Sequence, residues 1–86
     1  MRKVKKVTAR DNFELELLFD NNEVKVFDVK PYMDRGIFTE LKQPEYFNQV
    51  RIFFDSITWP NGQDFDPDHL YIESHNKRMQ RTLKRR

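Results

Sequence analysis

Apolar and polar residues alternate along the first third of the chain, which is typical of β-strands. Within residues 13–19, four apolar side chains share one face at a two-residue period: Phe13, Leu15, Leu17 and Phe19. Residues 20–23 can turn the chain, because asparagine accepts the positive φ angles of tight hairpins. Residues 24–29 return as a second strand, and residues 4–8 can pair as a third strand whose lysines suit an edge. The pattern predicts an N-terminal β-meander over residues 4–29.

A short helical pattern follows the meander. Pro31 ends the last strand, because proline has no N–H group to donate to a ladder. Residues 33–41 then place four apolar side chains on one helical face, which Gly36 interrupts: Met33, Ile37, Phe38 and Leu41. Pro44 stops this helix, and residues 45–48 have room for one further turn. We therefore expect a short helix over residues 33–41.

A second hairpin is predicted for residues 50–59. Its outgoing strand carries apolar side chains at alternate positions: Val50, Ile52 and Phe54. Asp55 and Ser56 can turn the chain, and residues 57–59 form the returning strand. The tripeptide at residues 60–62, Pro-Asn-Gly, then ends this strand in a tight turn.

The last predicted element is a helix. Asp66 supplies an N-cap, Pro67 stands at the first helical position, and Asp68 puts an acid in the first turn. The helix can end near Ser74, or it can continue, because four residues share one face across that point: Ile72, Asn76, Met79 and Leu83.

The order of these elements predicts an α+β fold. The domain is small and single, spans residues 1–74, and consists of a β-meander, a short helix, a second hairpin and a C-terminal helix. Residues 75–86 form a basic C-terminal tail, which either extends the last helix or is disordered because its like charges repel. The chain has 86 residues, 37% of them hydrophobic and 14% aromatic, which is enough to bury one small core.

The net charge of +2 conceals three segments of different charge. Residues 1–10 carry five bases and residues 77–86 carry six, and neither segment holds an acid. All 14 acids lie in residues 11–76 beside the remaining five bases, which gives this central part a net charge of −9. Because an acidic body attracts basic partners, we expect a small, basic protein partner.

The composition excludes several classes of protein. No apolar run reaches about 18 residues, so we expect no membrane span, and the basic start lacks the apolar stretch of a secretory signal. The absence of cysteine excludes disulfides and thiolate chemistry and fits a reducing, cytoplasmic location. No serine has the neighbouring base of a nucleophilic site, and no glycine-rich loop can hold phosphate. We therefore predict that the protein is not an enzyme and has no catalytic residues and no cofactor.

Alternating carboxylates form the strongest candidate metal motif. Asp64, Asp66 and Asp68 resemble the start of a calcium loop, but His69 and His75 replace its glycine and bidentate glutamate. The two histidines are six residues apart, on opposite sides of a helix, so they do not form a metal-binding pair. We predict no metal and assign the acids to helix capping. A weaker alternative is a small metal-dependent enzyme that uses Asp64, Asp66 and His69.

The basic tail offers a different function. If it is helical, Arg78, Arg81, Lys84 and Arg85 lie close together, and such clusters neutralise nucleic-acid phosphates. The acidic body repels a polyanion, and the tail has no aromatic side chain to stack on single strands. Nucleic-acid contact through the tail is therefore the alternative to protein binding.

Residues 57–71 resemble a known family. The pattern from Trp-Pro-Asn-Gly to Leu-Tyr is similar to the hallmark of short bacterial proteins named domain of unknown function 2442, and the likeness spans about residues 4–72. We expect structural roles for the residues that carry it: Trp59, Pro60, Asn61, Gly62, Asp64, Asp66, Pro67, Leu70 and Tyr71. Where family members usually have glycine in the first hairpin turn, this chain has Asn22. The resemblance implies a small α+β domain without established activity, cofactor or catalytic residues.

The same resemblance implies a binding module. Family members are often encoded beside another short protein, in an arrangement similar to toxin–antitoxin pairs, and some carry the domain ahead of a helix-turn-helix. We expect a non-enzymatic, antitoxin-like protein-interaction module, with a nucleic-acid-binding autoregulator as the alternative. Self-association into a homo-oligomer also stays open, because a small sheet with free edges gains from pairing.

Overall fold

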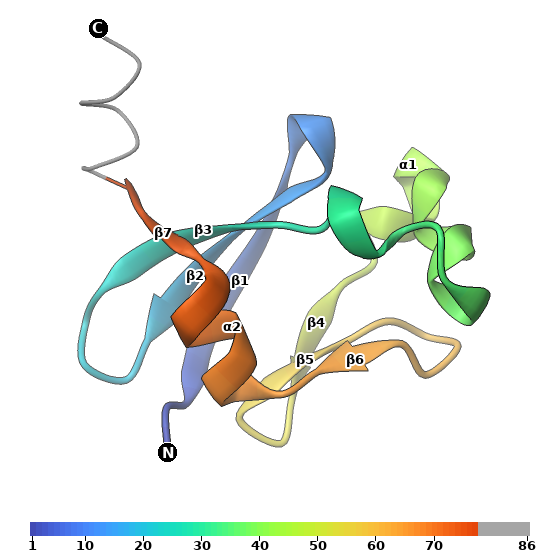
Figure 1. Ribbon diagram of the computed structural model, residues 1–86. Helices are drawn as coiled ribbons and strands as arrows, with labels where there is room; N and C mark the ends of the chain where they lie inside the picture. Colours follow the sequence, from blue (N-terminus) through green and yellow to red (C-terminus); the bar gives the residue numbers. More distant parts are fainter. Residues whose placement is uncertain (78–86) are drawn as a thin grey trace, which may run out of the picture.

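Two antiparallel sheets form the framework of the protein (Figure 1). The computed structural model describes residues 1–77. Its larger sheet contains three consecutive strands, β1 (Val4–Arg10), β2 (Glu14–Phe19) and β3 (Val24–Asp28), with β2 paired to both neighbours. The predicted β-meander is confirmed, and β1 continues past residue 8 to Arg10.

The smaller sheet contains β4 (Arg51–Phe53), β5 (Ser56–Thr58) and β6 (Asp64–Phe65), in that order. In the hairpin of β4 and β5, Phe53 pairs directly with Ser56, so the turn residues are Phe54 and Asp55. The predicted turn at Asp55 and Ser56 is wrong by one residue, because the buried hydroxyl of Ser56 finds its acceptor across the sheet on β6. The backbone N–H of Val4 donates to the carbonyl oxygen of Asp55 at 2.8 Å, which fastens this turn to the start of β1.

The segment between the two sheets is mainly 3₁₀-helical. Short 3₁₀ helices span Lys30–Tyr32 and Gly36–Lys42, where the sequence predicts one helix over residues 33–41. The predicted helix is wrong in extent because Gly36, with a φ of +47°, breaks the chain between Met33 and Ile37 and begins a separate 3₁₀ helix. A single α-helical turn, α1 (Pro44–Phe47), follows.

The second helix, α2 (Pro67–Glu73), begins where the sequence predicts. The carboxylate of Asp66 accepts hydrogen bonds from the backbone N–H groups of Asp68 and His69 at 3.1 and 3.2 Å, as an N-cap does. At the other end Ser74 is extended, with a ψ of 161°, so the helix stops before it.

A short strand, β7 (His75–Asn76), follows α2 and pairs with β3 at the edge of the larger sheet. The helix therefore does not continue across Ser74, and the first two residues that the sequence analysis assigns to the tail belong to the sheet. Such a short strand is defined by its partner rather than by a sequence pattern. No helix in the described part of the chain is long and apolar enough to cross a membrane.

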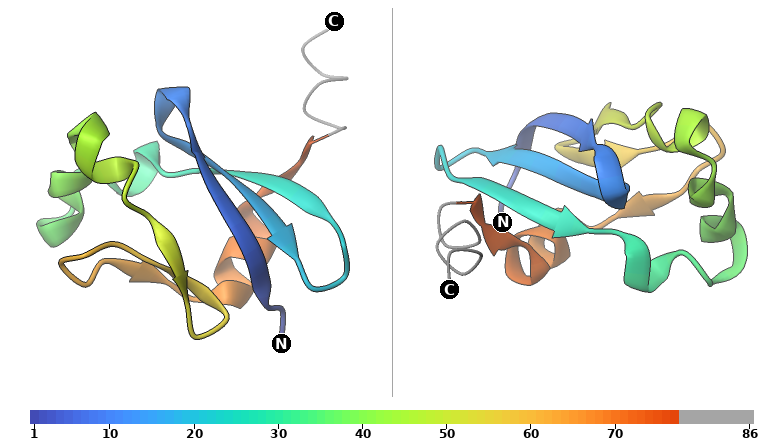
Figure 2. Two further views of the ribbon diagram at one scale, coloured as in Figure 1. Left: turned by 180° about the vertical axis from the view of Figure 1, so that it is seen from behind. Right: turned by 90° about the horizontal axis from the view of Figure 1, so that it is seen from above.

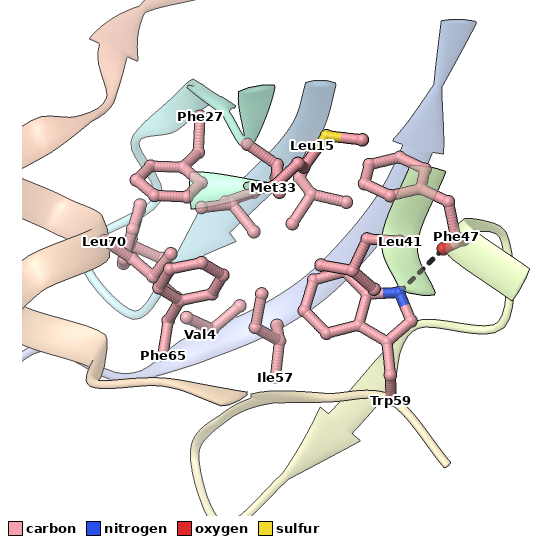
Figure 3. Close-up of a cluster of buried hydrophobic side chains, with 13 residues drawn as sticks. Val4, Leu15, Phe27, Met33, Leu41, Phe47, Ile57, Trp59, Phe65 and Leu70 are labelled. Carbon is pink, nitrogen blue, oxygen red and sulfur yellow. Dashed lines mark hydrogen bonds between the residues drawn. The ribbon is translucent and has the colours of Figure 1, made fainter. Parts of the chain in front are cut away.

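One hydrophobic core is shared by both sheets and α2. Figure 2 shows β4 beside β1 and α2 close to β3, which matches the contacts between these elements. The largest buried apolar side chains are Trp59, Phe19, Phe27, Phe47, Leu15, Leu17, Leu41, Ile57 and Leu70. The indole Nε1–H of Trp59 donates to the carbonyl oxygen of Phe47 at 2.9 Å, so the one polar atom of this side chain is satisfied inside the core (Figure 3).

Candidate interaction surface

The loop between β5 and β6 holds the Trp-Pro-Asn-Gly motif. Trp59 is buried, and Pro60 is exposed. Gly62 has a φ of +98°, and its N–H reaches back to the carbonyl oxygen of Trp59 at 3.0 Å. The backbone N–H of Asn61 donates to the hydroxyl of Tyr46 at 2.8 Å. These contacts fix the loop against α1.

Gln63, the next residue, is fully buried and joins three segments. Its Nε2 donates to the carbonyl oxygen of Ile37 at 2.8 Å and to Oε1 of Glu40 at 3.1 Å. Its Oε1 accepts a 2.7 Å hydrogen bond from the hydroxyl of Tyr46. Asn61 donates to the same Glu40 carboxylate at 2.8 Å. This network holds the 3₁₀ segment and α1 against the β5–β6 loop.

Tyr71 fastens α2 to the first hairpin. Its ring packs edge-on against Phe19, with ring centroids 5.1 Å apart, and Lys25 Nζ lies 4.0 Å from its centroid. The Tyr71 hydroxyl donates to the carboxylate of Glu23. This hydrogen bond is the main reason that the pKa of Glu23 lies below its ordinary value, and a second hydrogen bond, from Asn21, acts in the same direction. Both stabilise the charged form of the carboxylate.

Asp64, Asp66 and His69 are not assembled into a metal site. The Asp66 carboxylate caps α2, and His69 Nε2 lies 2.9 Å from the hydroxyl of Tyr32, with its ring parallel to that of Phe65. Within the described residues, no three histidine, cysteine, aspartate or glutamate side chains lie close enough to hold a metal ion. Asp64 is exposed on β6.

The four tail residues assigned to nucleic-acid contact lie outside the described residues: Arg78, Arg81, Lys84 and Arg85. The last described residue, Lys77, places Nζ 3.2 Å from Oε1 of Glu16. A guanidinium nitrogen of Arg10 approaches the same oxygen at 3.9 Å. Glu16 alternates with buried neighbours on β2, so these bases lie on the outer face of the larger sheet.

An exposed aromatic tip, absent from the sequence predictions, lies at the end of the β4–β5 hairpin. Phe53 is 50% exposed and Phe54 is 86% exposed, with their ring centroids 4.4 Å apart. Ile52, the preceding residue, is exposed as well. Scattered apolar residues are ordinary on a protein surface, but a contiguous group is typical of a contact surface.

The turn that presents these rings has an unusual backbone. The φ angles are +48° at Phe54 and +66° at Asp55, the pattern of a two-residue hairpin turn that Asn-Gly usually occupies. Such angles are uncommon for residues other than glycine and cost on the order of 1 kcal/mol each. The fold therefore holds an exposed phenylalanine in a strained conformation.

A groove of about 350 Å³ opens beside the aromatic tip. One part of its lining comes from the hairpin, with Phe53 and Phe54, and another part from the end of β6 and the start of α2, with Asp64, Asp66 and Pro67. We name this surface the hairpin groove. Three motif residues that the sequence analysis assigns to structure thus also reach a surface that can bind.

The N-terminal segment joins the elements that border the hairpin groove. The backbone N–H of Arg2 donates to Oδ1 of Asp68 on α2 at 2.8 Å. Two residues later, Val4 donates to Asp55 in the hairpin turn, as described above. The hairpin and the start of α2 are therefore both fixed to the same extended segment.

The carboxylates at the hairpin groove form no ion pair in the described part of the chain. Among the described residues, no ion pair involves Asp55, Asp64 or Asp66. The nearest base along the hairpin, Arg51, lies over the ring of Phe53, with its guanidinium carbon 6.0 Å from the centroid. The surface thus combines aromatic rings with unpaired negative charge.

A run of three apolar residues could have predicted the exposed tip. A strand sends successive side chains to opposite faces, so consecutive Ile52, Phe53 and Phe54 cannot all enter the core. The predicted alternation uses Val50, Ile52 and Phe54. In the structure Val50 is half-buried, and the other two are exposed.

Comparisons with known proteins confirm the predicted α+β fold and the suspected family. The family model described as a protein of unknown function, DUF2442, matches residues 4–76. A solved structure, "Putative DNA Binding Protein NE0471" from Nitrosomonas europaea ATCC 19718, matches with a TM-score of 0.75 and 22% sequence identity, over 86% of this chain and 49% of that one. This chain thus spans about half the length of that protein, and at this identity the likeness shows the fold. No curated protein matches the chain.

Proposed function

This chain belongs to DUF2442, a family of proteins of unknown function, and from that premise we propose that it is a non-enzymatic protein-interaction module whose partner is a small basic protein. The observation that carries the proposal is the hairpin groove, where the exposed rings of Phe53 and Phe54 lie close to unpaired carboxylates. The module would be the antitoxin-like component of a two-gene bacterial pair.

The exposed rings and the carboxylates of the groove both suit a protein partner. Aromatic side chains are enriched at interfaces, because they bury a large apolar area and have few rotatable bonds to immobilise. Removing that area from water contributes about 25 cal/mol per Å². The carboxylates add selectivity, because they attract a basic partner and repel an acidic one. Residues 1–77 hold 14 acids and 11 bases, and their net charge of −3 acts in the same direction at longer range.

Co-expression with the product of the adjacent gene tests this function. We expect the two proteins to copurify, and the complex to weaken as salt screens the charges. Phe54→Ser and Asp64→Asn should both reduce the yield of the complex. The matched control is Ile72→Ser, because Ile72 is 73% exposed but is not part of the groove lining. Failure to associate at physiological salt would reject the proposal.

Nucleic-acid binding by an autoregulator is the second candidate. It is supported by the description of the structural neighbour as a putative DNA-binding protein and by the bases on the outer face of the larger sheet. Lys77 lies on that face, and the bases of the tail follow it directly in the sequence. The residues that would contact phosphate are Arg78, Arg81, Lys84 and Arg85.

Removing the positive charges of these tail residues distinguishes nucleic-acid binding from protein binding. Replacing those four bases by glutamine should lower affinity for duplex DNA and flatten its salt dependence by about 0.9 in slope for each phosphate that is no longer neutralised. Lys42→Gln is the control, because Lys42 pairs with Asp34 and is not one of the four bases assigned to phosphate contact. An unchanged slope would reject contact through the tail.

A further inference from the structure

We propose that the hairpin groove binds a protein segment in which a bulky apolar side chain lies next to lysine or arginine, with Phe54 as its principal contact. This inference rests on the proposed function and deepens it, since it specifies the chemistry of the basic partner. Three properties of the described residues lead to it: the backbone of the turn, the exposed rings and the unpaired charge.

Phe54 occupies a turn position for which the fold gives no reason. Phe13 has a similar backbone, with a φ of +59°, but its ring packs edge-on against buried Phe47 at 5.3 Å, so core packing accounts for it. Phe54 is 86% exposed, and its ring contact among the described residues is with half-exposed Phe53. Asparagine or glycine would make the same turn with less strain. The strained, exposed ring therefore points to a contact beyond the folded domain.

The apolar part of the occupant follows from the lining of the groove. Phe53 and Phe54 contribute ring surface from the hairpin, and Pro67 contributes a rigid apolar surface from the start of α2. An apolar side chain that enters between these elements is removed from water on more than one side. Such a central, desolvated contact is typical of the residues that dominate binding energy.

The basic part of the occupant follows from the charges beside these rings. Asp64 lines the groove on β6 without an ion pair among the described residues, and Asp55 stands in the adjoining turn. Asp66 also lines the groove while it caps α2, so it adds negative charge without being free to rearrange. A lysine or arginine next to the apolar anchor would meet these carboxylates.

Other occupants fit less well. A twofold contact between two copies of the groove would bring the carboxylates of Asp55 and Asp64 from both copies into one interface, which is unfavourable. A nucleic-acid backbone would bring phosphate to the same carboxylates. The tail of this chain, residues 78–86, contains both bases and apolar residues, so the experiment must distinguish it from a separate partner.

The first test titrates the ¹⁵N-labelled full chain with three synthetic peptides of equal length. One alternates leucine and lysine, the second has glutamate in place of lysine, and the third has serine in place of leucine. We expect the leucine–lysine peptide to shift the backbone amide signals of residues 53–57 and 64–66, and the other two to bind at least about tenfold more weakly. Equal binding of all three, or shifts confined to another surface, would overturn the proposal.

Variants of the full chain provide the second test. Phe54→Asn preserves the turn, because asparagine accepts positive φ, and should weaken the leucine–lysine peptide at least about fivefold. Asp64→Asn should weaken it about two- to fivefold at low salt, with the difference fading at high salt. Ile72→Ser should leave binding unchanged. If Phe54→Asn binds like the unmodified chain, the inference is wrong.

Two further outcomes identify a different occupant. If the unmodified chain is a dimer and Phe54→Asn is a monomer in sedimentation experiments, a second copy covers the groove. If deletion of residues 78–86 alone shifts the groove signals and strengthens peptide binding about tenfold, the tail of the chain covers it. Either result overturns the proposal of a separate basic partner.

These tests also separate the inference from the proposed function. Copurification with the adjacent gene product that survives Phe54→Asn would reject the groove as the binding site but keep the interaction module. Peptide binding at the groove without copurification would reject that gene product as the partner but keep the recognition chemistry.

Discussion

The hydroxyl of Tyr46 donates a 2.7 Å hydrogen bond to Oε1 of Gln63, whose side chain is completely buried. The nitrogen of the same amide, Nε2, donates to the carbonyl oxygen of Ile37 and to the carboxylate of Glu40. One glutamine thus connects α1, the 3₁₀ segment and the β5–β6 loop. No buried side-chain nitrogen or oxygen in the described residues lacks a partner, and removing this amide would take one hydrogen bond each from Tyr46, Ile37 and Glu40.

We predict that Gln63→Ala lowers the free energy of unfolding by about 2–4 kcal/mol, because it removes three hydrogen bonds and leaves a cavity behind. The measurement is a urea unfolding curve. Gln49→Ala is the matched control, since Gln49 is exposed and its side-chain amide donates a long, 3.4 Å hydrogen bond to the carbonyl oxygen of Glu45. The control should change stability by no more than about 0.5 kcal/mol. Equal effects of the two substitutions would show that the buried network does not stabilise the fold.

One substitution should have opposite effects at the two strained phenylalanines. Phe54→Asn should raise the free energy of unfolding by about 0.5–1 kcal/mol, because asparagine adopts positive φ more readily and the ring that is lost is 86% exposed. Phe13→Asn should lower it by at least about 2 kcal/mol, because the contact of Phe13 with buried Phe47 disappears. Both values come from urea unfolding. A destabilised Phe54→Asn protein would mean that the exposed ring supports the fold.

Two carboxylates of the hairpin groove should differ in their effect on stability. Asp66→Ala should cost about 1 kcal/mol, because it removes the acceptor for the N–H groups of Asp68 and His69 at the start of α2. Asp64→Ala should change stability by less than about 0.5 kcal/mol, since its carboxylate is exposed and unpaired. Thermal unfolding of both variants measures the difference, and a larger loss for Asp64→Ala would contradict the assignment of the N-cap.

The contact between Tyr71 and Glu23 predicts a pH dependence. Because the folded pKa of Glu23 is depressed, its contribution to stability is present above the ordinary pKa that the unfolded chain has, and it is lost as the pH falls through the lower folded value. Tyr71→Phe removes the main cause, so the pKa of Glu23 should rise toward its ordinary value in an NMR titration of the side-chain carboxyl.

Asp34 is the internal control for that titration. Its pKa is lowered by Lys42, through a hydrogen bond and the charge of the ammonium group, and Tyr71 takes no part in it. The pKa of Asp34 should therefore be the same in the Tyr71→Phe protein. A shift at Asp34, or none at Glu23, would show that the hydroxyl of Tyr71 does not control the Glu23 carboxylate.

Regular alternation made the larger sheet predictable, whereas elements set by tertiary contacts were not. The apolar positions of β2 specify its inward face before any partner is known. The 3₁₀ segment depends on the positive φ of Gly36, which composition alone does not indicate. The strand β7 is defined by the pairing of His75 with Val26 on β3. A strand of two residues is too short to show an alternating pattern in the sequence.

The candidate site was predictable only in part. Asp64, Asp66 and Pro67 stand in a recognisable motif, but their roles in the sequence analysis are structural. Phe53 and Phe54 were missed because their exposure depends on the position of one turn. Moving that turn by a single residue changes which side of the hairpin each ring takes.

The hydrogen bonds from Arg2 to Asp68 and from Val4 to Asp55 connect the two sides of the hairpin groove, the start of α2 and the β4–β5 turn, through the first residues of the chain. This connection holds the two sides of the groove in place before a partner binds, so we expect little ordering of the backbone on association. It also places any segment fused ahead of Arg2 next to the groove, where it can block entry. An affinity tag or reporter attached at that end would compete with the contact that an experiment sets out to detect.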